Sequence, residues 1–241
     1  MWASKAVSGD WIALLDADDH WHPDKTARQL EALRTNPELK LIGSRVLGEM
    51  PVGPLAEAPV RPLHVRDFLI STPLGPSSAL IHRDALEAVG LFDEQLTSVE
   101  DRDLWLRIAA RFDTAEVQSP CWSYRVHSNQ MNRNAERMYQ NYDAVLQKFF
   151  TNHSRHHDLA NEAYAFLYLD STLSLLDQGD RTRALRFLLQ SFGRWPQPLG
   201  DSQLPTRHRR VKLLIRIILG ESVFGRMNQQ RKTWRDSAAQ D

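Results

Sequence analysis

The sequence predicts an α/β protein, with a mixed sheet flanked by helices and followed by a C-terminal α-helical subdomain. Up to Arg125, short apolar runs typical of strands alternate with segments of helical periodicity. From Asn132 onwards only the helical periodicity continues. Near the N-terminus, an apolar strand signal ends abruptly in acidic residues, which is typical of a ligand-binding edge in an α/β sheet.

The composition is that of an ordinary globular protein, with 42% hydrophobic residues, 25% charged residues and a formal net charge of zero. This balance argues against a dedicated nucleic-acid binder, which is usually strongly basic. The single cysteine, Cys121, excludes an internal disulfide and a thiolate metal cluster, and it favours a reducing compartment. No apolar run approaches the roughly 20 residues that span a bilayer, and the N-terminus has no apolar signal core. We therefore expect a cytoplasmic protein.

The first expected elements are a helix end over residues 2–8, which stops at Gly9, and a strand over Trp11–Leu15. Because this strand is apolar throughout, we expect it to lie buried in the centre of the sheet. Few residues precede it, so its neighbours either follow later in the chain or lie upstream of residue 1.

A helix over Asp24–Thr35 follows, with Leu30 and Leu33 expected to face the core and Lys25, Arg28 and Arg34 to face solvent. The later elements, in order, are strand Leu39–Val46, a proline-rich loop over 48–62, strand Ser77–His82, helix Arg83–Val89 closed by Gly90, loop Leu91–Ser98, helix Asp101–Arg111 and strand Val117–Arg125. The buried stripe expected on helix Asp101–Arg111 is Leu104, Trp105, Ile108 and Ala109.

Two further helices, Ala163–Leu176 and Arg183–Phe192, are joined by a Gly-Asp turn and resemble one tetratricopeptide-type unit. A single unit cannot stack on copies of itself, so we expect it to pack on the sheet. We divide the chain into a sheet-containing part over 1–131, a helical extension over 132–200 and a basic amphipathic tail over 201–241.

The segment Leu14–Asp19 carries three carboxylates, those of Asp16, Asp18 and Asp19, directly after an apolar strand. Such carboxylates repel one another, so they normally hold a hard cation or lie in solvent. The alternative is a solvated acidic turn before the next helix, with Asp24 as its N-cap.

Two histidines close to these carboxylates suggest a different metal site, a zinc site made of Asp18, His20, His22 and Asp24. The segment crosses a turn into a helix that begins near Pro23, so the four side chains would scatter. Zinc ligand sets usually also draw on a distant residue. We therefore disfavour the zinc site.

A second acidic motif, Glu100–Arg107, opens an amphipathic helix. Acidic residues in a first turn stabilise a helix by about 0.3–1 kcal/mol each, and Arg107 can pair with Asp103 four residues earlier. This structural role explains one or two of the carboxylates.

The flanks of both motifs are more specific. Ser8–Lys25 resembles the Asp-x-Asp segment of family 2 inverting glycosyltransferases, in which a Gly-Asp/Glu-aromatic-Ile strand leads into Leu-Asp-x-Asp-Asp and Trp-x-Pro-x-Lys. Glu87–Leu96 and Glu100–Arg107 resemble that family's Val-Gly-x-Phe-Asp-Glu-x-Leu segment and its Glu-Asp-x-Asp-Leu-Trp-Leu-Arg helix start. The resemblance covers roughly residues 2–131 and implies the Rossmann-like GT-A fold.

The resemblance implies roles for the acidic residues. Asp18 is expected to ligate Mg²⁺ or Mn²⁺ on the nucleotide diphosphate, whose charge a divalent ion neutralises, with Asp16 near the ribose or the metal. Asp101 is expected to be the general base that deprotonates the acceptor hydroxyl, with Glu100 as its neighbour.

The resemblance extends to two further segments. Gly75–Arg83 is similar to the segment that lines the acceptor side, so Ser77 and Ser78, together with Trp105, are expected to bind acceptor; the alternative for this segment is an ordinary buried strand. Tyr124–Met131 is similar to a Tyr-Arg-x-His segment, so Arg125 and His127 are expected near the diphosphate; the alternative for His127 is a surface or core histidine.

The sequence also departs from the family. The strands that carry Thr/Ser-Tyr-Asn and Asp-Asp-Gly-Ser are absent, so we expect an N-terminally truncated GT-A fold, and the Gln-x-x-Arg-Trp signature of processive synthases is absent too. The expected function is inverting transfer from a nucleotide-diphosphate-sugar to a glycan or lipid-linked acceptor, as in polysaccharide biosynthesis of the cell envelope. One alternative is a catalytically silent fragment that cannot bind donor. Another is a helical scaffold whose tail docks on a membrane or a partner.

The tail interleaves basic and apolar residues over 207–235. A basic helix with an apolar body is typical of an interfacial membrane helix, so residues 207–224 are expected to contact the inner face of the membrane peripherally. The alternative is a terminal helix that packs on the protein with its basic face in solvent.

Overall fold

The computed structural model describes residues 8–47, 53–125, 134–199 and 209–220. In these residues the strands form one mixed sheet in the order β1-β5-β3-β6-β2, with β4 also paired to β6. The strand bounds are β1 Trp11–Ala13, β2 His20–Trp21, β3 Leu39–Leu47, β4 Val60–Leu63, β5 Leu80–His82 and β6 Asp113–Ser123.

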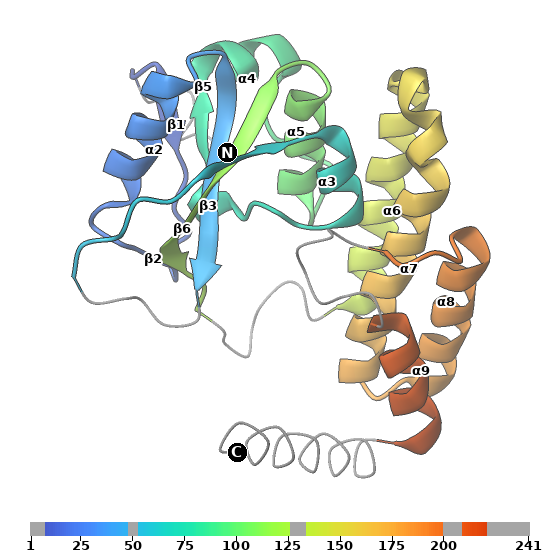
Figure 1. The fold of residues 1–241 in the computed structure, drawn as a ribbon. Coiled ribbons are helices and arrows are strands. Elements are labelled where there is room, and N and C mark those ends of the chain that lie inside the picture. The colour runs from blue at the N-terminus through green and yellow to red at the C-terminus, as the bar shows by residue number, and fades with distance from the viewer. Residues whose placement is uncertain (1–7, 48–52, 126–133, 200–208, 221–241) are drawn as a thin grey trace.

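Helices cover the sheet and then form a layer of their own beside it (Figure 1). Their bounds are α2 Lys25–Thr35, α3 Val65–Ile70, α4 Arg83–Val89, α5 Glu100–Ala109, α6 Ala135–Asn152, α7 Ala160–Asp177, α8 Arg181–Arg194 and α9 Arg209–Leu219, with 3₁₀ turns η1 Pro76–Ser78 and η3 Ser154–Leu159. The predicted α/β class with a C-terminal helical region is therefore confirmed. Among the described residues, no helix combines the length and the apolar character needed to cross a bilayer.

Strand direction decides where the functional residues gather. β3 and β6 run parallel, whereas β5 runs antiparallel to both β1 and β3. The carboxyl ends of β1, β3 and β6 therefore lie at the same edge of the sheet. In sheets of this kind ligands bind outside the carboxyl ends of the strands.

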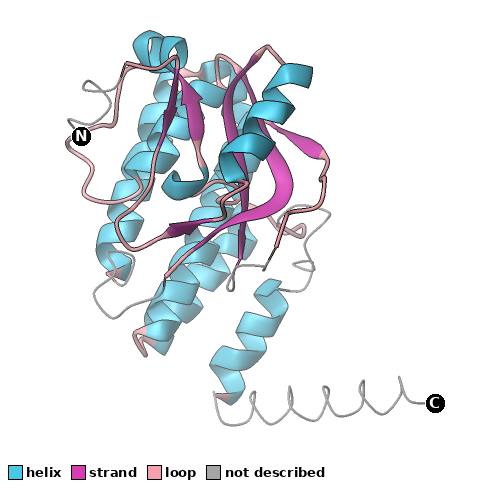
Figure 2. Cartoon of the chain, turned by 90° about the vertical axis from the view of Figure 1, so that its left-hand side faces the viewer, coloured by secondary structure: helices cyan, strands magenta, loops and turns pink. Residues whose placement is uncertain are grey.

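The two faces of the sheet pack against different helices, and in Figure 2 one helix lies in front of the strands while others lie behind them. On one face, Ala32 and Leu33 of α2 pack against Ile42, Leu80 and Val117. The other face belongs to a larger cluster that joins the strands to α3, α5, α6 and α7. Neighbouring strand residues such as Leu80 and Ile81 enter opposite clusters, because side chains alternate across a strand.

The C-terminal helices form the predicted hairpin. α7 and α8 are joined at Gly179, whose φ of 81° lies in the left-handed region that glycine adopts without strain. α9 packs on α8 through Leu213 and Ile217. This hairpin packs on the sheet-containing part through Phe166 and Leu167 of α7, which belong to the same cluster as residues of the sheet.

Several sequence-based expectations were wrong in detail. The strand expected over Trp11–Leu15 is the three-residue β1, and it lies at one end of the sheet order among the described residues rather than in the centre. Its apolar character has a local cause, because Ile12 enters the larger cluster and Leu14 packs against it, while Leu15 is 50% exposed. The helix end expected over residues 2–8, before this strand, falls almost entirely outside the described residues.

The inward and outward faces predicted for α2 are also partly wrong. Lys25 is buried and Leu30 is 42% exposed. The Lys25 ammonium lies 4.2 Å from the centre of the Trp21 ring and donates a 2.8 Å hydrogen bond to Gln29, which replaces its contacts with water.

Two elements differ from the loop and strand predicted between β3 and α4. The segment expected to be irregular over 48–62 contains the start of β4. In the part of the chain that the structure describes, β4 pairs only with β6, so Pro62 sits on an edge strand. The strand expected over Ser77–His82 begins at Leu80, and the preceding residues form η1. Helix α3 had no sequence signal of its own.

Candidate active site

The first acidic motif lies at the shared edge of the sheet, directly after β1. Asp16 and Ala17 are exposed, Asp18 is half-buried and Asp19 is buried. Partial burial raises the pKa of Asp16, and the carboxylates of Asp19, Asp18 and Glu100 raise it further. The two acidic motifs, more than 80 residues apart in the sequence, therefore share one electrostatic environment.

Asp19 links this motif to the end of β6. One carboxylate oxygen, Oδ1, accepts a 3.2 Å hydrogen bond from the backbone N–H of Arg125, whereas Oδ2 is buried without a hydrogen-bond partner in the described part of the chain. A buried carboxylate oxygen without a donor is costly unless a cation or a ligand completes it. The sequence placed Asp19 in the motif but gave no signal for this buried position.

A series of contacts through Ser77, Trp21 and Lys25 holds the backbone of Asp16 in place. Its backbone N–H donates to Ser77 Oγ at 3.0 Å, and the Trp21 indole donates to the Ser77 carbonyl at 2.6 Å. The Trp21 ring rests on the buried ammonium of Lys25, and burial lowers the pKa of that ammonium to about 8. The Trp-x-Pro-x-Lys segment thus holds the acidic turn against η1.

The second acidic motif begins α5. Val99, the residue before Glu100, is buried and adopts φ 57°, a left-handed conformation that is unfavourable for a β-branched side chain. Burial raises the pKa of Asp101 to about 6, against the lowering effect of Arg102 and of its 2.8 Å hydrogen bond from the Arg102 backbone. Glu100 adds to the increase. Asp101 therefore titrates close to neutral pH.

Arg102, which follows Asp101, is a buried cation that the sequence reasoning missed. Its guanidinium lies 4.5 Å from the Tyr142 ring centre and 3.6 Å from an Asp170 carboxylate oxygen, and it donates to the Thr72 hydroxyl. Another guanidinium nitrogen, Nη1, is buried without a hydrogen-bond partner in the described residues. An arginine in an otherwise acidic first helical turn was the one signal available for it.

The rest of the second motif is structural. Asp103 is buried and pairs with Arg107 at 2.7 Å and with Lys148 of α6 at 2.9 Å. Arg107 also donates to the carbonyls of Val89, Gly90 and Leu91. These bonds fix the Val-Gly-Leu-Phe-Asp-Glu segment against α5 and so confirm the expected pairing of Asp103 with Arg107.

The three residues expected to bind acceptor are buried. Ser77 bonds to Asp16, Ser78 donates to the Gly75 carbonyl at 2.8 Å, and Trp105 is 1% exposed with its ring edge-on to Phe92. Ser77 contacts the acidic turn directly, and in this structure none of the three side chains faces solvent.

The two residues expected near the donor diphosphate lie after β6. Arg125 is exposed, and its backbone contacts Asp19, so it is next to the first acidic motif. His127 falls outside the described residues.

The disfavoured zinc site does not form. His22 is buried, with Nε2 3.0 Å from the Gly53 carbonyl and Nδ1 accepting from the Asp24 backbone at 3.1 Å. An Asp24 carboxylate oxygen accepts from the Leu55 backbone. No group of three or more metal-binding side chains is arranged to hold an ion in the described segments.

The donor set does fit a divalent ion that is shared with a phosphate ligand. Mg²⁺ in nucleotide sites usually takes one or two protein carboxylates and completes its shell with phosphate oxygens and water. The oxygen donors here are those of Asp16, Asp18 and Asp19, whose mutual repulsion and unpartnered Oδ2 a cation would relieve. The assignment of Asp18 as the ligand stays a prediction.

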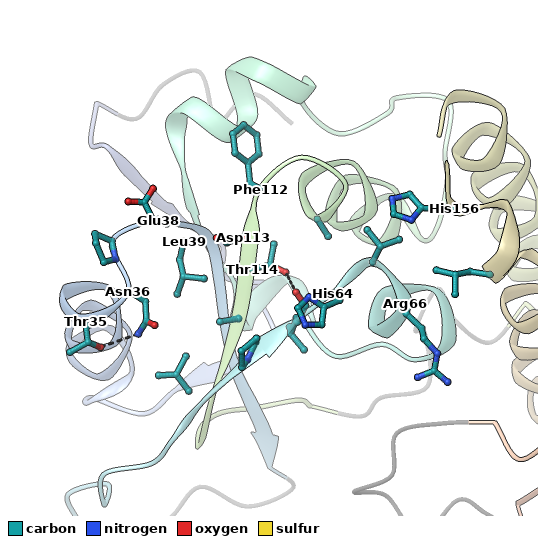
Figure 3. Close-up of a pocket in the computed structure, with 18 residues that line it drawn as sticks. Thr35, Asn36, Glu38, Leu39, His64, Arg66, Phe112, Asp113, Thr114 and His156 are labelled. Carbon is teal, nitrogen blue, oxygen red and sulfur yellow. Dashed lines mark hydrogen bonds between the residues drawn. The ribbon is translucent and has the colours of Figure 1, made fainter. Parts of the chain in front are cut away.

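A cavity of about 780 Å³ lies elsewhere, at the amino ends of β3 and β6 (Figure 3). It is lined by residues such as Asn36, His64 and Thr114, and by none of the predicted site residues. Because it opens at the opposite end of these strands, it is not part of the acidic site.

Comparisons with known proteins assign the chain to a family. The family described as "Glycosyltransferase like family 2" matches residues 55–184, more than half of the chain, and "Glycosyl transferase family 2" matches residues 1–89. A search of curated proteins finds no match.

Solved structures with similar folds share little sequence with this chain. TarS from S. aureus is 12% identical at a TM-score of 0.43, over 80% of this chain and 40% of TarS. A shorter TarS structure, residues 1–349, is also 12% identical at a TM-score of 0.41, over 85% of this chain and 76% of that one. The mannosyltransferase PcManGT from Pyrobaculum calidifontis, in complex with GDP-Man and Mn²⁺, is 17% identical at 0.49, over 88% of this chain and 56% of PcManGT.

The chain thus spans about half the length, or less, of full TarS and PcManGT. The family matches together cover residues 1–184, which include both acidic motifs and the helices from α2 to α7. The chain belongs to glycosyltransferase family 2.

Proposed function

We propose that this chain takes part in inverting transfer of a sugar from a nucleotide-diphosphate-sugar to a glycan or lipid-linked acceptor. The observation that carries this proposal is Asp101, a carboxylate at the start of α5 whose pKa burial raises to about 6. A general base is most effective when its pKa lies near the working pH. The charge of Glu100 raises the pKa of both Asp101 and Asp16, which supports the proposal that the two acidic motifs serve one reaction.

The chemistry is a direct displacement. Asp101 accepts the proton of the acceptor hydroxyl, whose oxygen attacks the anomeric carbon from the side opposite to the leaving group. The bond between the anomeric carbon and the diphosphate oxygen breaks, and the configuration inverts. Glu100 holds Asp101 and the acceptor in position, and its charge keeps the proton affinity of Asp101 high.

Asp18, with Asp16 beside it, would hold Mg²⁺ or Mn²⁺, which would neutralise the charge that develops on the diphosphate. Arg125 and His127 are proposed to approach the same diphosphate from the end of β6. Ser77, Ser78 and Trp105 are proposed to serve the acceptor side by supporting its wall. Ser77 does so directly, because its hydroxyl bonds to the Asp16 backbone.

The organisation proposed for the chain is a catalytic part over 1–131, a helical extension over 132–200 and a tail over 201–241. We also propose that the tail contacts a membrane peripherally through residues 207–224. Of this segment the structure describes 209–220, where one face of α9 packs on α8 and another is open. The exposed apolar residues of α9 are Val211, Ile218 and Leu219, next to the exposed basic residues Arg209 and Lys212.

The test compares Asp101→Asn with Asp18→Asn. Asp101→Asn should lower transfer at least about a hundredfold and leave Mn²⁺-dependent donor binding within twofold, because a missing base affects the chemical step. Asp18→Asn should instead weaken donor and metal binding. Titration calorimetry with nucleotide sugar and Mn²⁺ measures binding, and a sugar-transfer assay measures the step.

Asp158→Asn is the matched control, because Asp158 is exposed on η3, far along the chain from both motifs. It should change neither quantity. The opposite assignment, with donor binding lost in Asp101→Asn and kept in Asp18→Asn, would overturn the roles of the two motifs.

A further inference from the structure

A second cavity, of about 400 Å³, lies on the face of the sheet that carries α5 and α7. It is enclosed by the end of β3, β4, β6, the loop after α3, α7 and the first residue of α9. The lining residues that matter here are Arg45, Arg61, Thr72, Glu116, Asp170 and Arg209. Ligand pockets have volumes of roughly 300–1,000 Å³, so this cavity is large enough to hold a ligand group.

This cavity lies beside the proposed catalytic base. Two of its lining residues, Thr72 and Asp170, are the direct partners of the Arg102 guanidinium. Arg102 follows Asp101 in the first turn of α5 and donates its backbone N–H to the Asp101 carboxylate. The loop that supplies Thr72 continues into η1, which carries Ser77. A ligand in this cavity would therefore be held next to the acceptor side of the acidic site.

The side chains that line the cavity carry more positive than negative charge. Glu116 is paired with Arg61 at 3.1 Å, and Asp170 is paired with Arg102 at 3.6 Å. Arg45 and Arg209 are exposed, and the guanidinium group of neither forms a hydrogen bond or an ion pair with another described residue. After the carboxylates are matched with their partners, two guanidinium groups remain to face a ligand.

The neutral groups of the cavity suit an anion as well. Thr72 accepts a hydrogen bond from Arg102, so its own hydroxyl proton can be donated into the cavity. α9 begins at Arg209 and has no acidic residue in its first turn, so the positive end of its dipole lies at the cavity. Guanidinium groups, a hydroxyl donor and a helix amino end together match the oxygens of a phosphate.

We propose that this cavity binds a phosphate group of the acceptor, so that the acceptor is a phosphate-bearing molecule, anchored by Arg45 and Arg209 while its hydroxyl reaches Asp101. The inference deepens the proposed transferase function and rests on it. The two guanidinium groups match the charge of a phosphate better than that of a neutral glycan. Arg61 serves by holding Glu116, which would otherwise repel the phosphate.

The binding test uses the full chain, glycerol phosphate as the probe and no donor. Titration calorimetry at low salt should show saturable binding that Arg45→Gln and Arg209→Gln each weaken about tenfold, the loss of one charge-assisted hydrogen-bonded contact. The affinity should also fall as salt rises. Arg34→Gln is the matched control, because Arg34 is an exposed arginine on α2, on the other face of the sheet. It should bind as the parent chain does.

Circular dichroism confirms that each variant is folded, and Arg45→Lys, which keeps the charge, should recover part of the affinity. Equal binding by the parent chain, Arg45→Gln and Arg209→Gln would overturn the inference, as would the absence of saturable binding to the parent chain. Asp18→Asn should leave glycerol phosphate binding intact. A chain that binds the probe through these arginines but never binds nucleotide sugar would disprove the transferase function and leave the phosphate site standing.

A further arm identifies the source of the phosphate. Phosphatidylcholine vesicles that contain phosphatidic acid present the same monoester on a lipid. If Arg45→Gln weakens sedimentation with these vesicles as well as binding of glycerol phosphate, the acceptor phosphate is lipid-borne. If Arg45→Gln weakens only glycerol phosphate binding, the acceptor is a soluble or polymeric phosphate. Both results support the site. If Arg45→Gln weakens neither vesicle binding nor glycerol phosphate binding, the site is refuted.

Discussion

At the scale of single residues, the chemistry of this chain depends on how a few carboxylates are buried. Asp101 is partly buried beside a cation that is itself held by Asp170 and an aromatic ring, so its pKa rises only to about 6. The pKa of Asp16 is instead raised by burial and by the charges of three other carboxylates. We therefore propose that the same residue type serves proton transfer in one motif and cation binding in the other.

The first prediction concerns the pH dependence of transfer. Because Asp101 must be deprotonated to act as a base, kcat/KM should fall about tenfold per pH unit below about pH 6. A pH–rate profile of the donor-saturated protein, measured in non-coordinating buffers, tests this. A rate that stays constant from pH 7 down to pH 5 would argue against Asp101 as the base.

The second prediction concerns stability. The pKa of Asp101 is higher in the folded state than its ordinary value of 3.8, so proton binding favours folding. This contribution is complete below about pH 4 and is lost as the pH rises through about 6. Because asparagine does not titrate, the free energy of unfolding of Asp101→Asn should fall less between about pH 4 and about pH 6 than that of the parent chain. Urea unfolding at both pH values measures this difference. Asp158→Asn should leave the pH dependence unchanged.

At the scale of elements, α5 links the proposed catalytic residues to the packing of the fold. Its first turn carries Glu100 and Asp101, and its second turn anchors the preceding loop through Arg107. We predict that Arg107→Met destabilises the fold by about 3 kcal/mol, since the buried Asp103 loses one of its two cations and three carbonyls lose their donor. Arg111→Met is the control, because Arg111 is exposed and donates to one carbonyl, that of Ala88. Chemical denaturation of both variants measures the difference, and equal stability would mean that the anchor is unimportant.

A further prediction concerns the turn before η1. A Cβ at Gly75 would lie 2.7 Å from Cη2 of Trp122, which is too close unless the indole moves. The Trp122 indole donates to the Ser44 carbonyl, so it is not free to shift. Gly75→Ala should cost about 1–3 kcal/mol and displace η1, with Ser77 and the Asp16 turn that it supports. Retained thermal stability together with unchanged Mn²⁺-dependent donor binding would contradict this.

The elements also show what could be inferred without a structure. Helix α4 was predicted with its bounds, and α5, α7 and α8 were predicted as helices, because long periodic segments with glycine stops carry their own signal. The positions of Asp16, Asp18 and Asp101 followed from motifs. The burial of Lys25, the edge position of β1 and the pairing of Arg102 with Asp170 could not be predicted, because each is decided by residues far away in the sequence.

At the scale of the whole molecule, the sheet and the helical extension share a core. Tyr142, Phe149 and Phe166 from α6 and α7 lie in the same cluster as Ile12 and Leu41 from the strands. The proposed boundary at 131/132 therefore marks a change of architecture, and residues 1–131 alone would expose a large apolar face.

This leads to a prediction about fragments. Residues 1–131 expressed alone should aggregate or lack a cooperative thermal transition, whereas residues 1–199, which retain α6, α7 and α8, should keep one. Calorimetry and size-exclusion chromatography of the two fragments test this. A monomeric 1–131 fragment with a sharp transition would show that the sheet folds without its helical neighbours.

The single cysteine gives the chain a practical property. Cys121 has no exposed surface, and burial raises the pKa of its thiol, so little reactive thiolate is present at neutral pH. A cysteine introduced at an exposed position such as Val211 on α9 would therefore take a maleimide fluorophore selectively, with the native thiol left in place. Emission from that probe would report directly whether α9 enters an apolar environment when vesicles or a phosphate-bearing acceptor are added.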